Sequence, residues 1–418
     1  MPHVLVLSLV FPPDAVSTSQ IMGDLVQDLH ERGHTVSVLT TTPHYNRDAG
    51  AEARQPLRPW WGPLVRRSDF HGTPVFHTAM PAKSASVPRR LAAWSLFHAL
   101  SLLVGVITVR RVDVILTPSP PLSIGIVAWM LGGWHRAPFI YNVQELYPDI
   151  AINLGAVRNR TAIRLLFALE RFVYARAARI TLIAERMRRR LVEKGVPAAR
   201  TVVIPNFVDM TLLRAVPSPN EFTREADIDG RFVICYAGNL GPAQGLDTLL
   251  DAARLVADEP AIVLVLVGGG TLWNHLGTRI REEQLSNVRL VAHQPFSRVP
   301  EIYGASHLSV VSQAAATGSD AVPSKVYRIM ACGGAVLAAT DAESDLAHLI
   351  AAGGCGFVVP QESPQAIASA IRDAFHHRES LAAMGASGRR HVIAHYARPV
   401  VTARYDALID EVLKERAA

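Results

Sequence analysis

Residues 232–250 read FVICYAGNLGPAQGLDTLL, and this stretch decides the fold of the second half of the chain. The apolar run 232–241 has the length and composition of a buried strand, and the segment after the last glycine is expected to be a helix. Glycines at 238, 241 and 245 would let backbone amides approach an anion closely. A tight strand-to-helix turn would need the same glycines, so the loop by itself indicates either a turn or an anion site.

The same alternation of strand and helix continues outward from this unit along the whole chain. Further strands are expected at 3–11, 35–41, 112–120, 137–144, 179–185, 261–270, 287–293, 307–313, 335–339 and 355–360, and helices at 21–34 and 161–178. Such alternation predicts parallel sheets that are covered by helices on both faces. The fold class is therefore α/β, with two doubly wound, Rossmann-like domains that we expect to face each other across a cleft. Ligands bind beyond the carboxyl ends of such strands, so the residues at strand ends are the candidates for the site.

Length and composition fit two domains. The chain has 418 residues, of which 49% are hydrophobic, and the polar, proline-bearing stretch 201–230 is expected to be the linker. We predict a first domain at 1–205, a second at 206–390 and a C-terminal helix at 391–418 that crosses back to the first domain. The N-terminal residues lack a basic region and a cleavage site, and are expected to form a strand rather than a signal peptide. The three cysteines show no paired spacing, which favours a reducing cytosol and argues against a zinc site.

Charge is distributed unevenly between the two halves. Residues 1–200 carry 24 Lys and Arg against 13 Asp and Glu, a net charge of +11, and the remainder carries 18 against 23, a net charge of −5. The first half is therefore expected to face an anionic partner. A membrane surface is favoured over nucleic acid, because the arginines are not interleaved with stacking aromatic residues.

The most apolar run, LAAWSLFHALSLLVGVITV at 91–109, is bracketed by arginine pairs. Three interpretations remain open: a buried helix of the first domain, a helix that lies in the membrane interface with its arginines on anionic lipid, and a membrane span. The span is the weakest of the three, because polar residues lie near the middle and arginines flank both ends. Further cations lie nearby and favour the interfacial helix, namely Lys83, Arg136, Arg158, Arg160, Arg164 and Arg171.

The stretch SDAVPSKVYRIMACGGAVLAA, residues 319–339, places two cations where a helix should begin. Pro323 suits the first helical position, and Gly333 with Gly334 suits the exit. Lys325 and Arg328 would then lie near the positive end of the helix dipole, where acids are preferred. They are either a solvated face or cations that await an anionic ligand. A diphosphate would fit these cations together with the glycine loop at 238–245 and the second glycine-rich strand end at Gly268.

The segment YNVQELYPDI ends a predicted strand with Gln144, Glu145 and Asp149. Asp149 is either a helix cap or, like Glu145, an acid that binds or deprotonates a hydroxyl group. The histidines show no metal-ligand spacing, and no nucleophile signature of the G-x-S-x-G type occurs. The sequence therefore predicts neither a metal site nor a cofactor.

Taken in order, these segments resemble the retaining, nucleotide-sugar-dependent glycosyltransferases of family 4, which have the GT-B fold. The resemblance covers nearly the whole chain, and it rests on segments such as HERGHTVSVLTT, TVVIPNFVD, GNLGPAQGLDTLLDAARLV, LVLVGGGTLWNHL, YRIMACGGAVLA and CGFVVPQESPQAIASAI. Within the family, the chain looks most similar to the WbuB-like subgroup, the bacterial enzymes that add an N-acetylated amino-deoxy sugar in O-antigen or capsule synthesis. This similarity rests on the motifs QELYPD, GNLG with AQG, and VPSK before MACGG.

The resemblance implies a UDP-sugar donor, a polyprenyl-diphosphate-linked acceptor and a cytoplasmic enzyme held at the inner face of the membrane. The chain departs from the family pattern where other members carry two loop cations, a second glutamate and a histidine; here Asn239, Gln244, Arg328 and Gln144 stand at those positions. Lys325 is then expected to serve the donor diphosphate in place of the loop cations.

The expected site has two parts. Donor binding is assigned to Gly238, Asn239, Gly241, Gln244, Gly268, Asp320, Ser324, Lys325 and Arg328; the acceptor side to Ser17, Ser19, Gln144 and Asp149; and catalysis to Glu145 and Lys325. Domain closure is expected about Pro205 and Asn206. Two other functions remain open: a sugar-nucleotide epimerase of GT-B fold, and an inactive homologue that acts as a scaffold.

Overall fold

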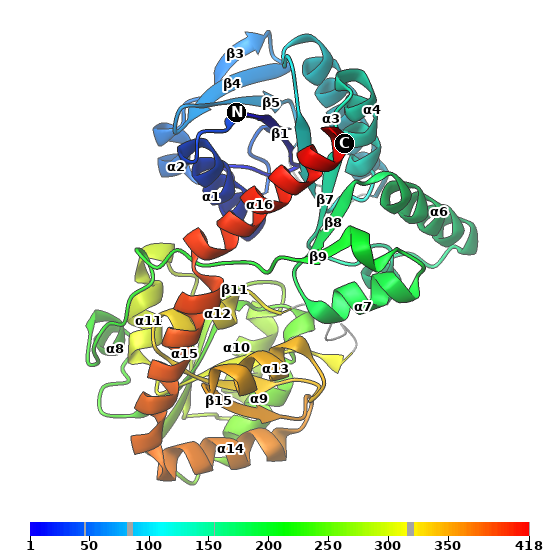
Figure 1. Ribbon diagram of the computed structural model, residues 1–418. Helices are drawn as coiled ribbons and strands as arrows, with labels where there is room; N and C mark the ends of the chain where they lie inside the picture. Colours follow the sequence, from blue (N-terminus) through cyan, green and yellow to red (C-terminus); the bar gives the residue numbers. More distant parts are fainter. Residues whose placement is uncertain (46, 82–86, 154, 316–321, 418) are drawn as a thin grey trace. The chain divides into compact units, whose positions relative to one another are not determined.

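The computed structural model describes residues 1–45, 47–81, 87–153, 155–315 and 322–417, and its contacts divide the chain into two compact units. The first unit comprises Met1–Pro205 with Val401–Ala418, and the second comprises Asn206–Val400 (Figure 1). The C-terminal helix, α16 (Arg398–Ala417), therefore begins in the second unit and packs on the first. The sequence-based boundary at 390 and 391 falls inside α15 (Leu381–Tyr396), which belongs wholly to the second unit.

Among its described residues, the first unit is built on a nine-stranded sheet in the order β3-β4-β5-β2-β1-β6-β7-β8-β9. Its strands are β1 (His3–Leu7), β2 (Thr35–Thr41), β3 (Arg58–Trp61), β4 (Val65–Phe70), β5 (Thr73–Thr78), β6 (Val114–Pro118), β7 (Phe139–Val143), β8 (Arg179–Leu182) and β9 (Thr201–Val203). The strands from β5 across to β9 pair in parallel, as the alternation of strand and helix predicts. At the other edge, β3 and β4 pair antiparallel, which the sequence analysis did not anticipate.

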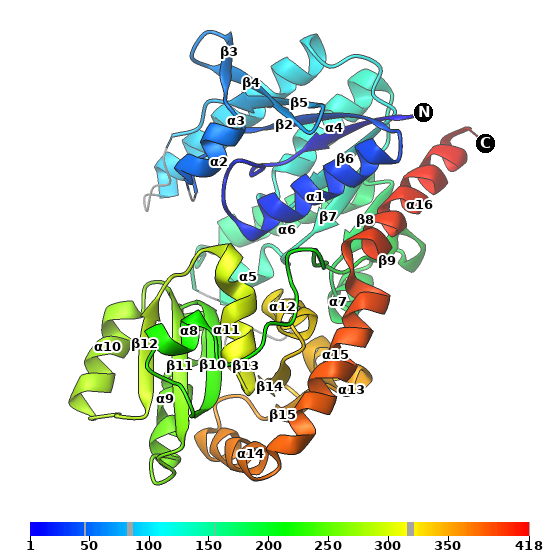
Figure 2. The ribbon, with the colours of Figure 1, turned by 90° about the vertical axis from the view of Figure 1, so that its left-hand side faces the viewer.

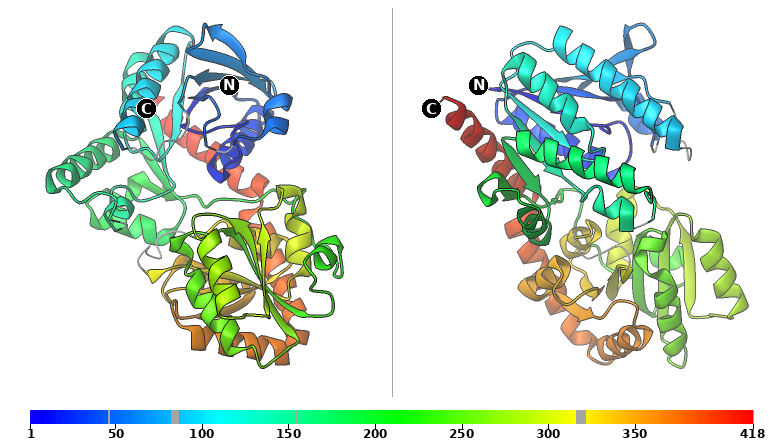
Figure 3. Two further views of the ribbon diagram at one scale, coloured as in Figure 1. Left: turned by 180° about the vertical axis from the view of Figure 1, so that it is seen from behind. Right: turned by 90° about the vertical axis from the view of Figure 1, so that its right-hand side faces the viewer.

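Helices cover both faces of this sheet. The helices of this unit are α1 (Ser17–Glu31), α2 (Ala49–Arg54), α3 (Val87–Ile107), α4 (Ile124–His135), α5 (Asp149–Asn153), α6 (Arg160–Arg176) and α7 (Glu185–Glu193), together with α16. Figure 3, at right, shows α3, α4 and α6 lying side by side over one face, and Figure 2 shows α1 and α16 over the other. The tail is held to the rest of the first unit by an ion pair between Glu411 and Arg179 and by a hydrogen bond of 2.7 Å between Asp406 and His34.

The second unit has a six-stranded sheet in the order β12-β11-β10-β13-β14-β15, and every pairing in it is parallel. The strands are β10 (Phe232–Asn239), β11 (Ile262–Gly269), β12 (Val288–Ala292), β13 (Leu308–Ser312), β14 (Ala335–Ala339) and β15 (Gly356–Val359). The helices are α8 (Glu221–Glu225), α9 (Leu246–Leu255), α10 (Trp273–Glu282), α11 (Val299–Ala305), α12 (Lys325–Ala331), α13 (Asp345–Gly353), α14 (Pro364–His376) and α15.

Strand β10 shows how this sheet builds two cores. Phe232, Ile234 and Tyr236 face the cluster formed with α9, α10 and α14, whereas Val233 and Cys235 face the cluster formed with α8 and α11. A strand buried on both faces reads as a continuous apolar run rather than an alternating one. This is the physical reason why the run at 232–241 is recognisable in the sequence.

The predicted linker at 201–230 is more ordered than expected. Its first residues form β9, at the edge of the first sheet, and its later residues form α8, whose Phe222 is buried in the second unit. The boundary between the units lies between Pro205 and Asn206.

Candidate functional site

Two glycines lie side by side where β10 and β11 end. Gly238 pairs with Gly268 in the parallel ladder. A Cβ on Gly268 would lie 1.9 Å from the carbonyl oxygen of Gly238, and Gly268 has a φ of +150°. Only glycine therefore permits the two backbones to approach so closely. Gly238 and the following Asn239 remain exposed to solvent at the carboxyl end of this central strand.

The loop after β10 forms a short 3₁₀ turn over Pro242–Gln244 and enters α9 through Gly245, which has a φ of +59°. The Ser312 hydroxyl, at the end of β13, donates a hydrogen bond of 2.5 Å to the Gln244 carbonyl oxygen. The neighbouring strand thus fixes the position of the loop. Gly241 is buried beside the Asn239 amide, so it serves the turn rather than presenting an exposed backbone.

The Lys325 side chain reaches this loop from α12. Its Nζ lies 3.7 Å from the centre of the Tyr236 ring and donates a 3.2 Å hydrogen bond to Gln244 Oε1. The Tyr236 hydroxyl lies 3.0 Å from the same Gln244 oxygen. A Cβ on Gly238 would come within 3.1 Å of the ammonium, so glycine leaves room for the lysine. The structure thus brings together Gly238, Gln244 and Lys325 of the predicted donor site.

The electrostatic state of Lys325 is unusual. Burial lowers the pKa of the ammonium to about 7, and the neighbouring positive charge of Arg328 lowers it as well. The residue keeps some exposed surface, but its charged group is enclosed by protein atoms. Within the described part of the chain, neither cation forms an ion pair with a carboxylate. An anion that entered here would gain charge-assisted hydrogen bonds and would favour the protonated lysine.

The remaining donor-side predictions have different surroundings. Arg328 places its guanidinium 5.1 Å from the centre of the Phe296 ring, and burial lowers its pKa. Ser324 precedes α12 but makes no side-chain cap hydrogen bond, and the helix begins at Lys325 rather than at Pro323. Asp320 lies outside the described residues.

On the acceptor side, Gln144 belongs to a buried hydrogen-bond network. Its amide donates to Asn142 Oδ1 at 2.6 Å, and the Asn142 amide donates to the hydroxyls of Thr181 and Tyr405 at 2.9 Å each. Tyr405 lies on α16, so the network joins the end of β7 to the C-terminal helix. Gln144 is only 8% exposed, which fits support of this strand end better than direct contact with an acceptor.

Three other residues assigned to the acceptor side also differ in their surroundings. Asp149 begins α5 and pairs with the Lys194 ammonium, which also contacts Glu170 at 2.8 Å. Ser19 is fully buried in α1, whereas Ser17 is exposed at the start of that helix. Of these residues, only Ser17 is open to a ligand without a rearrangement.

Glu145, in contrast, is an exposed residue with a perturbed carboxyl group. Although the residue is exposed overall, the protein atoms around its carboxyl group reduce the hydration of that group and raise its pKa. The pKa values of Tyr147 and Tyr45 are raised mainly by burial. The negative charge of Glu145 raises both pKa values further, whereas the positive charge of Arg90 opposes the rise at both tyrosines. These four residues therefore form one electrostatic cluster in the first unit.

Sequence reasoning missed three members of this cluster. Tyr147 follows two residues after Glu145, and Tyr45 follows the end of β2, so their place at strand ends was a usable signal. Arg90 comes from the beginning of α3, and no local pattern links it to the strand ends. Beneath Tyr45, the buried Asp14 carboxylate accepts hydrogen bonds from the backbone amides of His44 and Tyr45, at 3.1 and 3.0 Å.

The described residues hold neither a candidate metal centre nor a disulfide, and one of their helices is apolar enough to cross a membrane. No group of three His, Cys, Asp or Glu side chains in them is arranged to hold a metal ion. Cys235, Cys332 and Cys355 are buried free thiols. One helical stretch, Arg89–Ile107, is long and apolar enough to cross a membrane, and 28% of it is buried within the protein. This low burial argues against the interpretation of the predicted 91–109 helix as a core helix.

Comparison with known families matches both halves of the chain. Residues 18–206 match the glycosyl transferase 4-like domain, and residues 218–391 match the domain of glycosyl transferases group 1. A protein of Escherichia coli strain K12 named for colanic acid biosynthesis, the glycosyl transferase WcaI, is 26% identical over 383 residues, which are 89% of this chain and 91% of WcaI. WbjE of Pseudomonas aeruginosa, named as a glycosyltransferase, is 24% identical over 73% of this chain and 76% of its own length.

Solved structures show the same fold. HepE of Anabaena, in complex with UDP, superposes with a TM-score of 0.73 at 16% identity, covering 98% of this chain and 100% of HepE. Sucrose-phosphate synthase from Thermosynechococcus elongatus gives a TM-score of 0.73 at 17% identity, covering 99% of this chain and 100% of the synthase. The two-domain α/β architecture with parallel sheets is thus that of the GT-B glycosyltransferases. The fold and both domain matches agree, and the chain is a glycosyltransferase of the GT-B type, similar to a relative named for colanic acid biosynthesis.

Proposed function

We propose that the chain transfers a sugar from a UDP-sugar to a lipid-linked acceptor in the synthesis of a cell-surface polysaccharide. The observation that carries the proposal is the Lys325 ammonium, enclosed by Tyr236 and Gln244 at the glycine-rich ends of β10 and β11. A buried cation of this kind costs free energy unless a ligand repays the loss of hydration. The diphosphate of a nucleotide sugar supplies the two negative charges that would do so.

The comparisons support this donor class. HepE has been solved in complex with UDP, with UDP and glucose, and with UDP-glucose. The WcaI name refers to colanic acid, and the sequence resembles the WbuB-like subgroup, from which we take an N-acetylated amino-deoxy sugar as the transferred group. Transfer with retention of the anomeric configuration also comes from the family resemblance.

In the proposed reaction, the bond between the anomeric carbon and the diphosphate oxygen breaks, and UDP leaves with the electron pair. Lys325, with the positive charge of Arg328 nearby, stabilises the charge that develops on the diphosphate. An acceptor oxygen forms the new bond to the anomeric carbon. The raised pKa of Glu145 makes its carboxylate a suitable acceptor for the proton that this oxygen loses.

The first unit has a surface suited to the inner face of the cytoplasmic membrane, where we place the enzyme. Leu103 on α3 is 48% exposed, and Trp134 on α4 is 64% exposed, together with Trp129 and Met130. These helices lie next to one another, and arginines flank α3 at both ends. Tryptophan beside arginine is the composition that favours the interface between lipid and water.

A single assay separates this function from the two others that the sequence leaves open. Purified protein is incubated with UDP-sugars and a membrane lipid extract, and both UDP release and lipid glycosylation are measured. Lipid glycosylation is the expected result. Conversion of the free UDP-sugar to an epimer would favour the epimerase, and neither reaction with any donor would favour a scaffold.

A further inference from the structure

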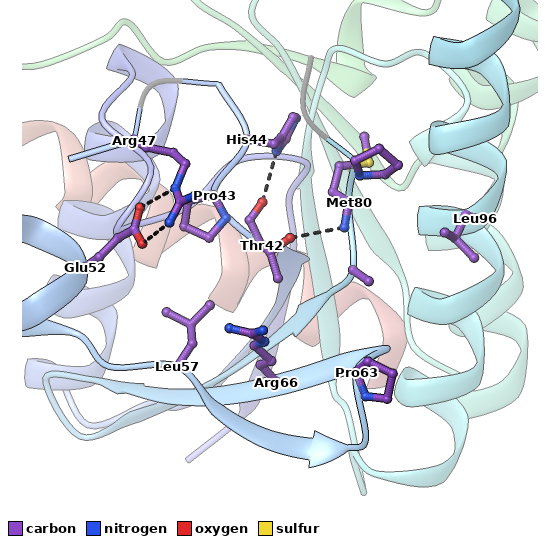
Figure 4. Close-up of a pocket in the computed structure, with 12 residues that line it drawn as sticks. Thr42, Pro43, His44, Arg47, Glu52, Leu57, Pro63, Arg66, Met80 and Leu96 are labelled. Carbon is purple, nitrogen blue, oxygen red and sulfur yellow. Dashed lines mark hydrogen bonds and ion pairs between the residues drawn. The ribbon is translucent and has the colours of Figure 1, made fainter. Parts of the chain in front are cut away.

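Two adjoining hollows open in the first unit beside the beginning of α3, with volumes of about 610 and 480 Å³. They share His44, Met80, Pro81 and Leu96 in their walls. Figure 4 shows the larger one, with the residues after β2 on one side and Leu96 of α3 on the other. We refer to the two hollows together as the α3 pocket, and none of the residues assigned above to the donor or acceptor side lines it.

The charged walls of the α3 pocket are cationic. Arg47 and Glu52 pair with each other at 2.7 Å, so they contribute no net charge. Arg66, Arg89 and Arg90 also line the pocket, are exposed, and form no ion pair with any residue that the structure describes. Arg89 and Arg90 line one hollow and Arg66 lines the other, so each hollow offers positive charge to an anionic ligand in a concave site rather than on a flat surface.

The rest of the pocket is apolar and continues along α3. Trp94, Leu96, Met80 and Pro81 form the apolar wall. From there an exposed stripe runs at helical spacing along the outer face of the helix, through Ala92, Leu96, Ala99, Leu103 and Ile107. No Asp, Glu, Lys or Arg occurs from Leu91 to Val109. At the helical rise per residue, the stripe is roughly 22 Å long.

A cationic hollow that opens onto an apolar stripe fits a molecule with an anionic head and a long apolar chain. We propose that the α3 pocket binds the head group of a polyprenyl diphosphate, with the diphosphate on Arg89 and Arg90 and the polyprenyl chain along the α3 stripe. This inference rests on the proposed function, because it locates the lipid-linked acceptor of that reaction. The concave shape favours one bound head group over general adhesion to a bilayer.

The place of the pocket also fits the chemistry. Arg90 and Tyr45 line the same hollow, and the positive charge of Arg90 opposes the rise in the pKa of Tyr45 and of Tyr147. A diphosphate held by Arg90 would therefore lie beside Tyr45, one of the two tyrosines on which the Glu145 charge also acts. This arrangement assigns Arg89 and Arg90 to acceptor binding and Glu145 to the acceptor hydroxyl.

The test measures binding of farnesyl diphosphate, a soluble short-chain probe, to the full chain by calorimetry. The Arg89→Gln/Arg90→Gln variant should bind it about tenfold more weakly or worse, because two charge-assisted contacts are lost. The matched control is Arg160→Gln/Arg164→Gln, which removes two exposed arginines from α6 in the same unit. The control should bind like the unmodified chain, and thermal unfolding checks that each variant is folded. The Leu96→Gln variant should also weaken farnesyl diphosphate but not inorganic pyrophosphate.

Several outcomes would overturn the proposal. Equal losses in the two arginine variants would show a general effect of charge, and unchanged binding in the Arg89→Gln/Arg90→Gln variant would remove the pocket from acceptor binding. If pyrophosphate bound as tightly as farnesyl diphosphate, the isoprenoid chain of the probe would not contribute to binding, and the proposed role of the apolar stripe would be wrong. Displacement of the probe by UDP would show that the probe occupies the donor site. If the enzyme uses no UDP-sugar but the binding of farnesyl diphosphate still requires Arg89 and Arg90, the proposed function is wrong and the proposed binding site is supported.

Discussion

The two units each carry a cationic site, but the cations differ in their surroundings. In the second unit, the Lys325 ammonium is enclosed against the Tyr236 ring, and its pKa is about 7. In the first unit, Arg89 and Arg90 are exposed at the α3 pocket. Enclosure makes a site selective for a small ligand that can replace the lost hydration, whereas exposed arginines can hold a head group whose chain remains outside.

The difference also concerns protonation. A buried lysine can lose its proton near neutral pH, whereas an arginine stays charged. Donor binding at Lys325 should therefore depend on pH and on a single residue, while acceptor binding at the α3 pocket should be shared among several residues. The experiments below test this contrast, beginning with the largest expected effect.

Replacement of Lys325 by methionine should cause the largest loss. The Lys325→Met variant removes the only predicted donor-side cation that contacts the glycine loop, so turnover should fall about 100-fold to 1,000-fold, as when one preorganised donor to a developing charge is removed. The same variant should be more stable by about 2 kcal/mol at pH 7.5, since a lysine with a lowered pKa destabilises the folded state wherever the unfolded chain binds more protons.

UDP release and chemical denaturation measure the two effects of this substitution. The matched control is Lys414→Met, which removes an exposed lysine of α16. Normal activity of the Lys325→Met variant would show that Lys325 does not bind the donor diphosphate. Reduced stability of that variant would show that the buried ammonium does not destabilise the folded protein.

Replacement of Glu145 by glutamine should affect turnover rather than donor binding. The Glu145→Gln variant cannot accept a proton, so turnover should fall about 100-fold, within the usual range for general acid–base catalysis. Affinity for a UDP-sugar should stay within about twofold, because the loss concerns proton transfer and not a charged contact to the diphosphate. Glu193→Gln, on the exposed face of α7, is the control. A parallel loss of UDP-sugar affinity would contradict the separation of the two sites.

Affinity for a UDP-sugar should fall as the pH rises above about 7, by up to tenfold per pH unit. Below this pH Lys325 is already protonated in the free protein, and above it binding must take up a proton. Calorimetry at pH 8 in two buffers of different ionisation enthalpy measures that uptake. Lys325→Met should bind weakly with no such dependence. Absence of proton uptake by the unmodified chain would mean that Lys325 is charged at this pH before the ligand binds.

The smallest expected effect concerns the apolar stripe. Combined Leu96→Gln, Leu103→Gln and Ile107→Gln substitutions should reduce flotation with anionic liposomes about fivefold, because exposed apolar contacts with the acyl chains are lost. A matched variant in the second unit changes Leu212, Leu255 and Val358 to glutamine, which are also exposed apolar residues. Equal reduction in both variants would argue against a specific membrane surface on α3.

Buried strands were the part of the fold most accessible from the sequence. The predicted strand 35–41 coincides with β2, and the predicted strand 232–241 differs from β10 by two residues at its end. The β10 run is apolar because the strand is buried on both faces, whereas β2, TVSVLTT, is rich in the β-branched residues that favour strands. The predicted strand 3–11 is too long, since β1 ends at Leu7. The apolar Phe11 beyond it packs against Phe70 from a loop, so its hydrophobicity does not indicate a strand.

Exposed elements were harder to predict. Strands β3 and β4 carry several exposed residues, and nothing in their pattern separates them from a loop. Within the candidate site, Lys325 and the glycine loop were recognisable from charge and spacing. The contact of the Lys325 ammonium with the Tyr236 ring and the joint action of Arg90 and Glu145 on Tyr147 depend on long-range packing, which no local pattern contains.

The most direct test of the proposed function is the mass of the lipid product. Purified enzyme, a panel of UDP-sugars and membrane lipid extract are incubated, and the lipids are analysed by mass spectrometry alongside UDP release. We predict a lipid diphosphate that gains the mass of one sugar residue, with UDP formed in equal amount, and no such product with Lys325→Met. UDP-sugar turnover without a glycosylated lipid, or a glycosylated lipid formed equally well by Lys325→Met, would contradict the account.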